Sequence, residues 1–226
     1  SGAPKPNAHA GGQFWNHTMG TADDGYQLRI AKELPCAAGS IISAEEAPEK
    51  IDHAIRTALR EKKPAYIEIA CNVSAQPCRA PGPVSALLNE PASDPATLKA
   101  AVRAVSEFIA GKEKPVILIG SKLRAAGAEE AVIRLADALG CAVATMGAAK
   151  SFFPEDHADY IGTFWGSASS PKVADVFNWA DSVLALGCIF NDYSTEGWTA
   201  WPRGAAVVNA DKDITKVGDQ TFDNIH

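Results

Sequence analysis

The histidine best suited to chemistry lies in a loop near the start of the chain. Residues 14–20 surround His17 with Trp15, Asn16 and Thr18, just before an expected helix. An imidazole exchanges a proton near neutral pH, so His17 could act as a general acid or base. Judged from its neighbours alone, a structural role is more common for such a histidine.

Other histidines are weaker candidates. His157 follows Glu155 and Asp156, and one histidine with two adjacent acids is too small a set to indicate a metal site. His53 lies among charged residues beside an apolar helix face, which is typical of a solvated surface residue, and His9 lies in a glycine-rich loop. We therefore expect no metal site in this chain.

Two turns could lie at the ligand-binding edge of a sheet. Residues 120–127 join an expected strand to a helix, and a helix N-terminus in that position can hold a phosphate. Their spacing is not the G-x-G-x-x-G of a dinucleotide site, so a plain turn is favoured over a nucleotide site. Residues 190–194 follow another buried strand, where either a ligand site or a structural loop is consistent with the sequence.

Periodicity predicts the elements that would position His17. Apolar residues at helical spacing over residues 26–34 predict a helix that ends at Pro35. Ser43 and Glu46 form a capping box, which predicts the start of a second helix. The buried face of that helix should contain Ile51, Ala54, Ile55, Ala58 and Leu59. Residues 65–70 alternate in polarity and predict a strand.

Proline and glycine crowd residues 76–92, which we interpret as a semi-extended linker between two domains. Asp94 and Pro95 then cap a helix. Expected helices over residues 98–109, 125–139 and 171–180 alternate with expected strands over residues 116–119, 142–146, 182–186 and 205–209. The chain is therefore expected to be α/β, with parallel sheets flanked by helices.

The overall composition excludes several classes of partner. The 226 residues carry a net charge of -6 and have no basic patch, so we expect no nucleic-acid partner. No apolar run approaches the roughly 20 residues that span a bilayer, so we expect no membrane segment. The five cysteines form no C-x-x-C pair and are typical of reduced, mostly buried thiols in a cytoplasmic protein. The chain starts at Ser1 within a loop, which suggests a piece of a longer protein.

The sequence resembles the pyruvate decarboxylases, a family of thiamin-diphosphate-dependent 2-oxo acid decarboxylases, and looks closest to their bacterial and plant branch. The resemblance is nearly continuous. The matching segments are residues 16–20, 26–28, 44–48, 50–53, 63–72, 120–126, 149–155 and 190–193.

The resemblance implies a domain plan, cofactors and partners. Residues 1–75 would be the second half of the pyrimidine-binding domain, and residues 93–226 most of the Rossmann-like central domain, which is linking and regulatory. The family uses thiamin diphosphate and Mg²⁺. The motifs that hold them lie outside this sequence, so the chain alone should be inactive and bind neither tightly. A small 2-oxo acid is the implied substrate, and a homodimer or homotetramer the implied assembly.

The resemblance also implies a role for two residues. The family places a pair of histidines beside the substrate, where His17 matches the second histidine and Asn16 stands at the first position. An asparagine forms hydrogen bonds but does not titrate near neutral pH. We expect a proton relay through this position to be lost or rerouted. Residues 121–124 contain no cysteine, so we also expect none of the thiol-based activation of yeast-like members.

Three functions remain open from the sequence. The first is conversion of pyruvate to acetaldehyde and CO₂ by the parent protein. The second is decarboxylation of a bulkier 2-oxo acid, such as indolepyruvate or phenylpyruvate. The third is a non-catalytic α/β module that binds a nucleotide or a partner chain.

Overall fold

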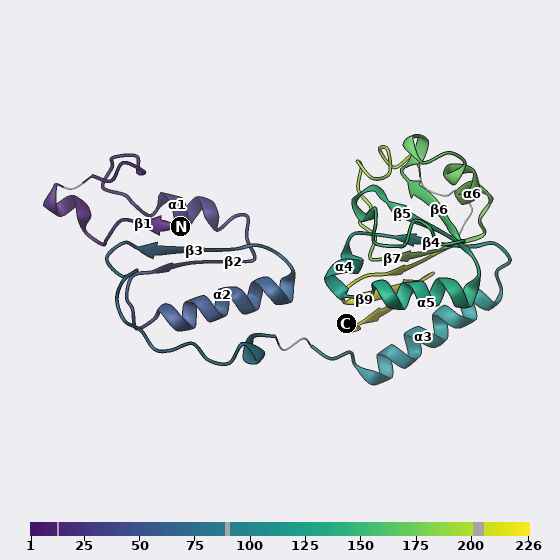
Figure 1. Ribbon diagram of the computed structural model, residues 1–226, viewed down its shortest axis with the longest axis horizontal. Helices are drawn as coiled ribbons and strands as arrows, with labels where there is room; N and C mark the ends of the chain where they lie inside the picture. The colour runs from purple at the N-terminus through teal and green to yellow at the C-terminus, as the bar shows by residue number, and fades with distance from the viewer. Residues whose placement is uncertain (13, 89–90, 201–205) are drawn as a thin grey trace. The chain divides into compact units, whose positions relative to one another are not determined.

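The computed structural model describes residues 1–12, 14–88, 91–200 and 206–226. The chain divides into two compact units, Ser1–Glu90 (unit 1) and Pro91–His226 (unit 2). Both are α/β, with mostly parallel strands and flanking helices, as the sequence predicts (Figure 1). None of the helices in the described ranges is long and apolar enough to cross a membrane.

Unit 1 is built on a three-stranded parallel sheet in the order β1-β3-β2. Helices α1 and α2 lie on opposite faces of this sheet (Figure 1). Its core forms around Ile41, Ala47, Ala70 and Val73. The elements are β1 (Gly2–Ala3), η1 (Ala8–Gly11), α1 (Tyr26–Ala31), β2 (Ala37–Ile41), α2 (Ala47–Glu61), β3 (Ala65–Ala70) and η2 (Val84–Leu87).

Strand β2 and the end of α1 differ from the sequence-based expectation. The first helix stops at Ala31, and Leu34 beyond it is 85% exposed. The chain then turns, and the amide of Cys36 donates to the carbonyl of Pro64 as β2 begins to pair with β3. The sequence of β2 is Ala-Ala-Gly-Ser-Ile, with almost no β-forming residues, so its pairing partner rather than its own propensity makes it a strand.

Helix α2 begins with the predicted capping box, and its buried face matches the prediction in part. The Ser43 hydroxyl accepts from the Glu46 amide at 3.4 Å, and the Glu46 carboxylate accepts from the Ser43 amide at 3.4 Å. Ala54 is buried as expected, whereas Ile55 is 41% exposed. Leu59 is also exposed, and Thr57 is buried in its place. The three-stranded sheet covers one narrow stripe of the helix, which leaves the neighbouring apolar stripe outside.

Unit 2 is built on a seven-stranded sheet in the order β10-β9-β8-β7-β4-β5-β6. The strands are β4 (Pro115–Ile119), β5 (Ala142–Met146), β6 (Tyr160–Phe164), β7 (Ser182–Leu186), β8 (Ala206–Ala210), β9 (Ile214–Val217) and β10 (Gln220–Asp223). The helices and 3-10 turns are α3 (Pro95–Ala110), α4 (Lys122–Ala126), α5 (Glu129–Leu139), η3 (Gly147–Ala149), η4 (Gly166–Ala168) and α6 (Val173–Trp179).

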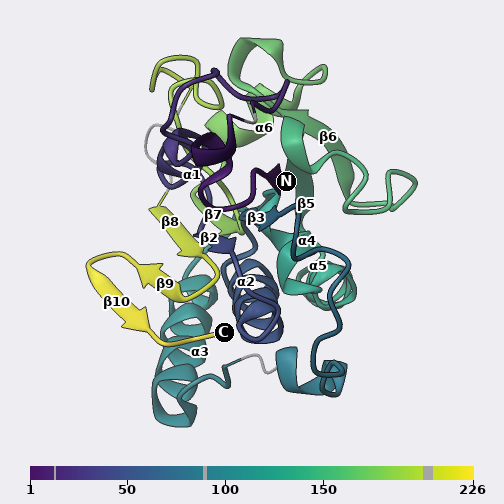
Figure 2. The same ribbon diagram turned by 90° about the vertical axis from the view of Figure 1, so that its left-hand side faces the viewer.

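Helices cover both faces of this sheet, as predicted. Val105 of α3 and Val132 of α5 pack with Ile117 on one face. Phe177 of α6 packs with Val116 on the other. The sheet is parallel from β8 to β6, as predicted, and β9 and β10 add an antiparallel hairpin at one edge, which lies against α3 (Figure 2).

In unit 2, the start of α3 and the break between α4 and α5 are determined by local hydrogen bonds and backbone conformation. The Asp94 carboxylate accepts from the amide of Thr97 at 2.7 Å, which confirms the predicted cap of α3. The helix expected over residues 125–139 is divided into α4 and α5, because Gly127 adopts a left-handed φ of 60°. Strand β8 starts at Ala206, and residue 205 of the expected strand lies outside the described residues. Residues 89–90 of the expected linker also lie outside them.

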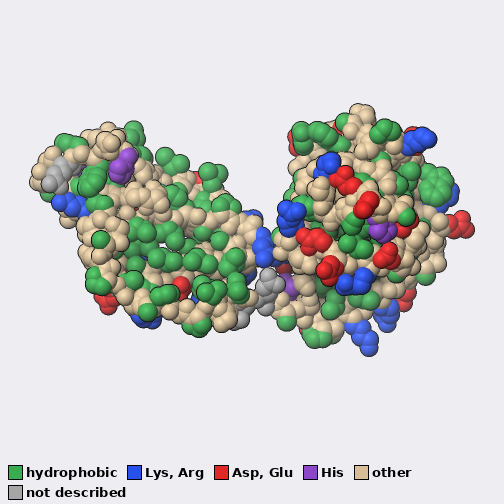
Figure 3. All heavy atoms as spheres, viewed as in Figure 1, with side chains coloured by type: hydrophobic (Ala, Val, Ile, Leu, Met, Phe, Trp, Pro, Cys, Tyr) green, Lys and Arg blue, Asp and Glu red, His purple; other side chains and the backbone are tan. Residues whose placement is uncertain are grey.

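Acidic and basic side chains are interspersed over the face of unit 2 seen in Figure 3. All five cysteines are free. Cys141 and Cys188 are buried as expected, but Cys78 is exposed.

Candidate active site

The loop of residues 14–20 in unit 1 is a tight turn held by Thr18. The Thr18 amide and hydroxyl both donate to the carbonyl of Trp15, at 3.0 and 2.8 Å. The Gly20 amide donates back to the Thr18 hydroxyl at 3.3 Å, and Gly20 has a φ of 68° that favours glycine. Thr18 therefore fixes the shape of the turn without using the side chains of Asn16 and His17.

Asn16 and His17 are exposed on this turn. The His17 backbone is anchored from α1, because the Gln27 amide nitrogen donates to its carbonyl oxygen at 3.2 Å. Within the described residues, neither the imidazole of His17 nor the side-chain amide of Asn16 has a hydrogen-bonding partner. The imidazole lies 6.0 Å from the Trp15 ring between centroids. Both polar groups are thus presented outward from a fixed backbone.

A second histidine ties the start of this loop to the segment before α1. The imidazole Nε2 of His9 lies 3.1 Å from the Asp24 carboxylate, and the His9 side chain is only 16% exposed. The His9 ring also contacts the edge of Phe14, with centroids 5.3 Å apart. Sequence reasoning missed this pair and the Gln27 anchor, because both join residues on different local elements and neither produces a periodic signal.

Asp23 also stabilises the segment before α1, through hydrogen bonds of its own. Its carboxylate pairs with the Arg29 guanidinium and accepts from the Gly25 amide at 3.0 Å. The Arg29 hydrogen bond is the main reason why the pKa of Asp23 lies below its ordinary value, with the Gly25 amide second. Asp23 therefore stays ionised at neutral pH and acts as a structural acceptor rather than an acid.

The described residues contain no group of three or more His, Cys, Asp or Glu side chains placed to hold a metal ion. Two buried polar atoms near the turn, the indole nitrogen of Trp15 and Nδ1 of His9, lack a partner among the described residues. A buried N–H without an acceptor costs about 1–3 kcal/mol. Because the indole nitrogen of Trp15 is buried, the polar groups that the turn presents at its surface are those of Asn16 and His17.

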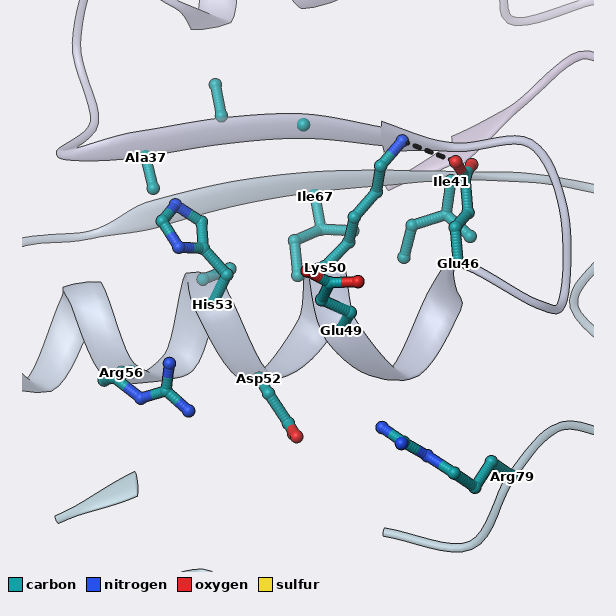
Figure 4. Close-up of a pocket in the computed structure, with 13 residues that line it drawn as sticks. Ala37, Ile41, Glu46, Glu49, Lys50, Asp52, His53, Arg56, Ile67 and Arg79 are labelled. Atoms are coloured by element: carbon teal, nitrogen blue, oxygen red, sulfur yellow. Dashed lines mark ion pairs between the residues drawn. The ribbon is translucent and has the colours of Figure 1, made fainter. Parts of the chain in front are cut away.

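A separate cavity of about 710 Å³ lies between β2 and α2 (Figure 4). The Lys50 ammonium crosses it and contacts the Glu46 carboxylate at 3.0 Å and the Ser40 carbonyl at 2.7 Å. His53 and Arg56 project from α2 beside it (Figure 4). Neither Asn16 nor His17 lines this cavity, so it is distinct from the candidate site.

The other sequence candidates lie in structural settings. His157 pairs with Asp137 at 3.1 Å and packs on the Phe153 ring in unit 2. His53 is exposed, as predicted. The turn after β4 is held by backbone contacts, since the Lys122 amide donates to the Gly187 carbonyl at 3.1 Å. His157 and the turn after β4 belong to unit 2, and His53, in unit 1, lines the cavity between β2 and α2 rather than the His17 turn.

Comparisons with known proteins agree with this architecture. The family model described as the central domain of thiamine pyrophosphate enzymes matches residues 102–225. Thiamine pyrophosphate is another name for thiamin diphosphate. A probable pyruvate decarboxylase of Schizosaccharomyces pombe is 45% identical across the whole chain, and a pyruvate decarboxylase of Neurospora crassa is 45% identical across 90% of it. Pyruvate decarboxylase 1 of Arabidopsis thaliana is 40% identical across 98% of it.

These matches show the family to which the chain belongs and how much of a relative's length it covers. The two fungal relatives are 45% identical to this chain and the plant relative is 40% identical. The sequence was expected to be most similar to the bacterial and plant branch, and these identities do not support that expectation. The chain spans about 40% of the length of the curated relatives it matches. The chain therefore belongs to the thiamine pyrophosphate enzyme family, as part of a protein similar to the pyruvate decarboxylases.

Proposed function

We propose that the whole protein containing this chain is a thiamin-diphosphate-dependent decarboxylase that converts pyruvate to acetaldehyde and CO₂. The observation that carries the proposal is 45% identity, across the whole chain, to a protein described as a probable pyruvate decarboxylase. Residues 1–75 would belong to the pyrimidine-binding domain, residues 76–92 would be a linker and residues 93–226 would form the central domain. The match of residues 102–225 supports the last of these assignments.

The cofactor, with Mg²⁺, supplies the electron sink that makes loss of CO₂ possible when it is bound. Within this chain, His17 is the group suited to exchange a proton with the substrate. Its imidazole is exposed, while Gln27 and the Thr18 turn hold its backbone in place. General acid or base catalysis by such a group typically contributes about 10²–10⁴-fold to a rate.

Asn16 would have a different role from its neighbour. Its amide can donate to a carboxylate and accept from a hydroxyl, but it does not titrate near neutral pH. We propose that Asn16 orients the substrate and that proton exchange on this side of the site depends on His17.

The surface of unit 1 supports a larger assembly. Phe14 and Met19 flank the turn and are 65% and 71% exposed, and apolar side chains gather over the middle of unit 1 in Figure 3. Exposed apolar surface of this kind marks interaction sites. We propose that other parts of the whole protein, as a homodimer or homotetramer, cover this surface. The five free thiols support a cytoplasmic location.

A substrate panel with the whole protein tests this function. The purified protein, supplied with thiamin diphosphate and Mg²⁺, would be assayed for aldehyde release from pyruvate, phenylpyruvate and indolepyruvate. We expect the highest kcat/KM for pyruvate and no release when the cofactor is withheld. A higher kcat/KM for phenylpyruvate or indolepyruvate than for pyruvate would show that the protein acts on a bulkier 2-oxo acid instead of pyruvate. Absence of aldehyde from all three substrates would overturn the decarboxylase proposal.

A further inference from the structure

The connection between β1 and α1 carries the His17 turn, and its described residues lie on the α1 side of the unit 1 sheet (Figure 1). Its start is fixed to the sheet, because the Ala3 carbonyl of β1 accepts from the Cys71 amide at 2.9 Å. The 3-10 turn η1 follows, and its first residue, Ala8, is only 1% exposed. His9 therefore follows directly on a segment that is anchored to the sheet and buried.

The last residues of this connection are fixed to α1. The Asp23 carboxylate accepts from the Gly25 amide at 3.0 Å and pairs with the Arg29 guanidinium of α1. These contacts hold the start of the helix without involving residues 14–20. Asp24, the residue after Asp23, is therefore held at the start of α1.

A single side-chain hydrogen bond joins these two anchored ends. The imidazole Nε2 of His9 lies 3.1 Å from the Asp24 carboxylate, and the two side chains are 16% and 25% exposed. An ionised carboxylate only accepts hydrogen bonds, so Nε2 carries a proton and donates it to this bond. Nδ1 of His9 is buried and has no partner among the described residues. A hydrogen bond to a charged group is roughly twice as strong as a neutral one, so this bond closes the connection that carries His17.

A short chain of contacts leads from His9 to His17. The His9 ring meets the edge of the Phe14 ring, with centroids 5.3 Å apart. The next residue, Trp15, offers the carbonyl that accepts from both the amide and the hydroxyl of Thr18, at 3.0 and 2.8 Å. His17 lies between Trp15 and Thr18 in this turn. A shift of His9 would therefore reach the first residue of the turn directly.

Apolar packing within unit 1 does little to hold the turn. Phe14 and Met19 are 65% and 71% exposed, and Asn16 and His17 are exposed as well. Segments with little buried apolar surface are held by their few polar contacts. The position of the turn in unit 1 therefore depends on such contacts, among which the bond of His9 is largely shielded from water.

We propose that His9 is a positioning residue, which holds His17 in place for proton transfer through the bond between His9 and Asp24. The role of His9 rests on the proposed function of His17 in decarboxylation. His9 itself would not meet the substrate, because its side chain is largely buried and its Nε2 is occupied. A catalytic group that moves by about 1 Å can lose about 10²-fold in rate, so loss of the bond should lower kcat much more than it changes KM.

Pyruvate decarboxylation by the whole protein, loaded with thiamin diphosphate and Mg²⁺, gives the first test. We expect His9→Ala to lower kcat about tenfold and to change KM less than about twofold. His157→Ala is the matched control, because His157 is 17% exposed, bonds Asp137 at 3.1 Å and packs on the Phe153 ring. Its kcat should stay within about twofold of that of the unmodified protein, because neither partner belongs to the connection between β1 and α1. Equal kcat values for the two variants would overturn the proposal.

Two amide variants separate the hydrogen bond from the bulk of the ring. The side-chain NH₂ of His9→Gln reaches about as far as Nε2 of an imidazole, whereas that of His9→Asn is one bond shorter. We expect His9→Gln to restore kcat to within about threefold of that of the unmodified protein, and His9→Asn to stay close to His9→Ala. A kcat for His9→Gln no higher than that for His9→Asn would contradict a role for the bond.

Removal of the acceptor tests the same bond from its other end. Asp24→Ala should lower kcat as much as His9→Ala does, and the double variant should lose little more than either, because both changes remove one interaction. Asp24→Ala also serves if His9→Ala fails to fold. Fully additive losses in the double variant would show that the two residues act independently, against the proposal.

Hydrogen exchange within the His17 turn reports the position of the turn without depending on activity. At short labelling times of the whole protein, we expect faster exchange of the Thr18 and Gly20 amides in His9→Ala and unchanged exchange in His157→Ala. Identical exchange in both variants would overturn the proposal even in an active decarboxylase. If the unmodified protein released no aldehyde, the decarboxylase function would fail instead, and the exchange would still show whether His9 holds the turn.

Discussion

The side-chain amide of Gln27 donates a hydrogen bond to the backbone carbonyl of His17 at 3.2 Å. Gln27 lies in the first turn of α1, so this bond ties the turn that carries Asn16 and His17 to a helix. A hydrogen bond of this kind contributes about 1 kcal/mol. The orientation of the His17 loop therefore depends on a residue ten positions further along the chain.

Gln27→Ala should lower the activity of the whole protein without unfolding it. Loss of about 1 kcal/mol of anchoring corresponds to roughly a fivefold fall in kcat/KM for pyruvate. Gln76→Ala is the matched control, because Gln76 donates to the Asn72 carbonyl at 2.7 Å on another loop. Equal kcat/KM values for the two variants would show that the Gln27 bond has no part in positioning His17.

Asn16→His should introduce a titrating group at the first position of the pair. A free imidazole titrates near pH 6.5, so the variant should gain a pH dependence of kcat close to that value. The measurement is the pH profile of pyruvate decarboxylation by the whole protein, with the exposed Asn72→His as a control. An unchanged rate and an unchanged profile would contradict a proton-relay role for this position.

Gly120→Ala should destabilise unit 2 strongly. The new Cβ would lie 2.2 Å from backbone atoms of Gly187 and Cys188, and neither backbone can move without breaking the β4–β7 contacts. We expect a loss of about 3 kcal/mol or more of unfolding free energy. Gly111→Ala is the control, since no atom lies within 4 Å of its Cβ position and its φ is -94°. Denaturant unfolding of both variants gives the comparison, and similar midpoints would refute the close approach.

Asp181 should make stability depend on acid pH. Its carboxylate accepts from the amides of Glu113 and Lys114, and its pKa lies below its ordinary value, first because of the Glu113 amide. A depressed folded-state pKa gives stabilisation that is present above the unfolded pKa of about 3.9 and lost as pH falls through the folded pKa. Asp181→Asn should therefore lower the Tm at pH 7 by a few degrees, and less at pH 3.

The control for this prediction is Asp219→Asn, at an exposed residue in the β9–β10 turn. Its Tm should follow that of the unmodified chain at both pH values. If Asp181→Asn lowers the Tm by the same amount at pH 7 and pH 3, the carboxylate charge is not the source of the stabilisation.

The strands with strong local signals could be predicted from the sequence. Ala65–Ala70, Ala142–Met146 and Ser182–Leu186 have the expected bounds, because alternation or a continuous apolar run determines how each is buried. Strand β2 and the β9–β10 hairpin could not be predicted in this way. They are strands because a neighbour offers hydrogen bonds, and a partner strand leaves no trace in local composition.

The candidate site, like the fold, could be predicted from the sequence only in part. His17 was singled out by its titratable ring and by the family resemblance, but the residues that position it were not. His9 pairs with Asp24 across 15 positions, and Gln27 reaches back to His17 across 10. Such contacts depend on how the loop folds over α1, so periodicity and composition could not reveal them. Ile55, predicted to be buried, is exposed for a related reason, because burial depends on how much sheet is present to cover a helix.

The most direct test of the account is the effect of His17→Ala on pyruvate decarboxylation by the whole protein loaded with thiamin diphosphate and Mg²⁺. The matched control is His53→Ala, because His53 is also exposed in unit 1 but lines a different cavity. A proton-transfer role predicts a fall in kcat of about 10²–10⁴-fold for His17→Ala. It also predicts a change of less than twofold for His53→Ala, with equal Tm values. A kcat for His17→Ala within twofold of that of the unmodified protein would contradict the claim that this loop forms part of the decarboxylase site.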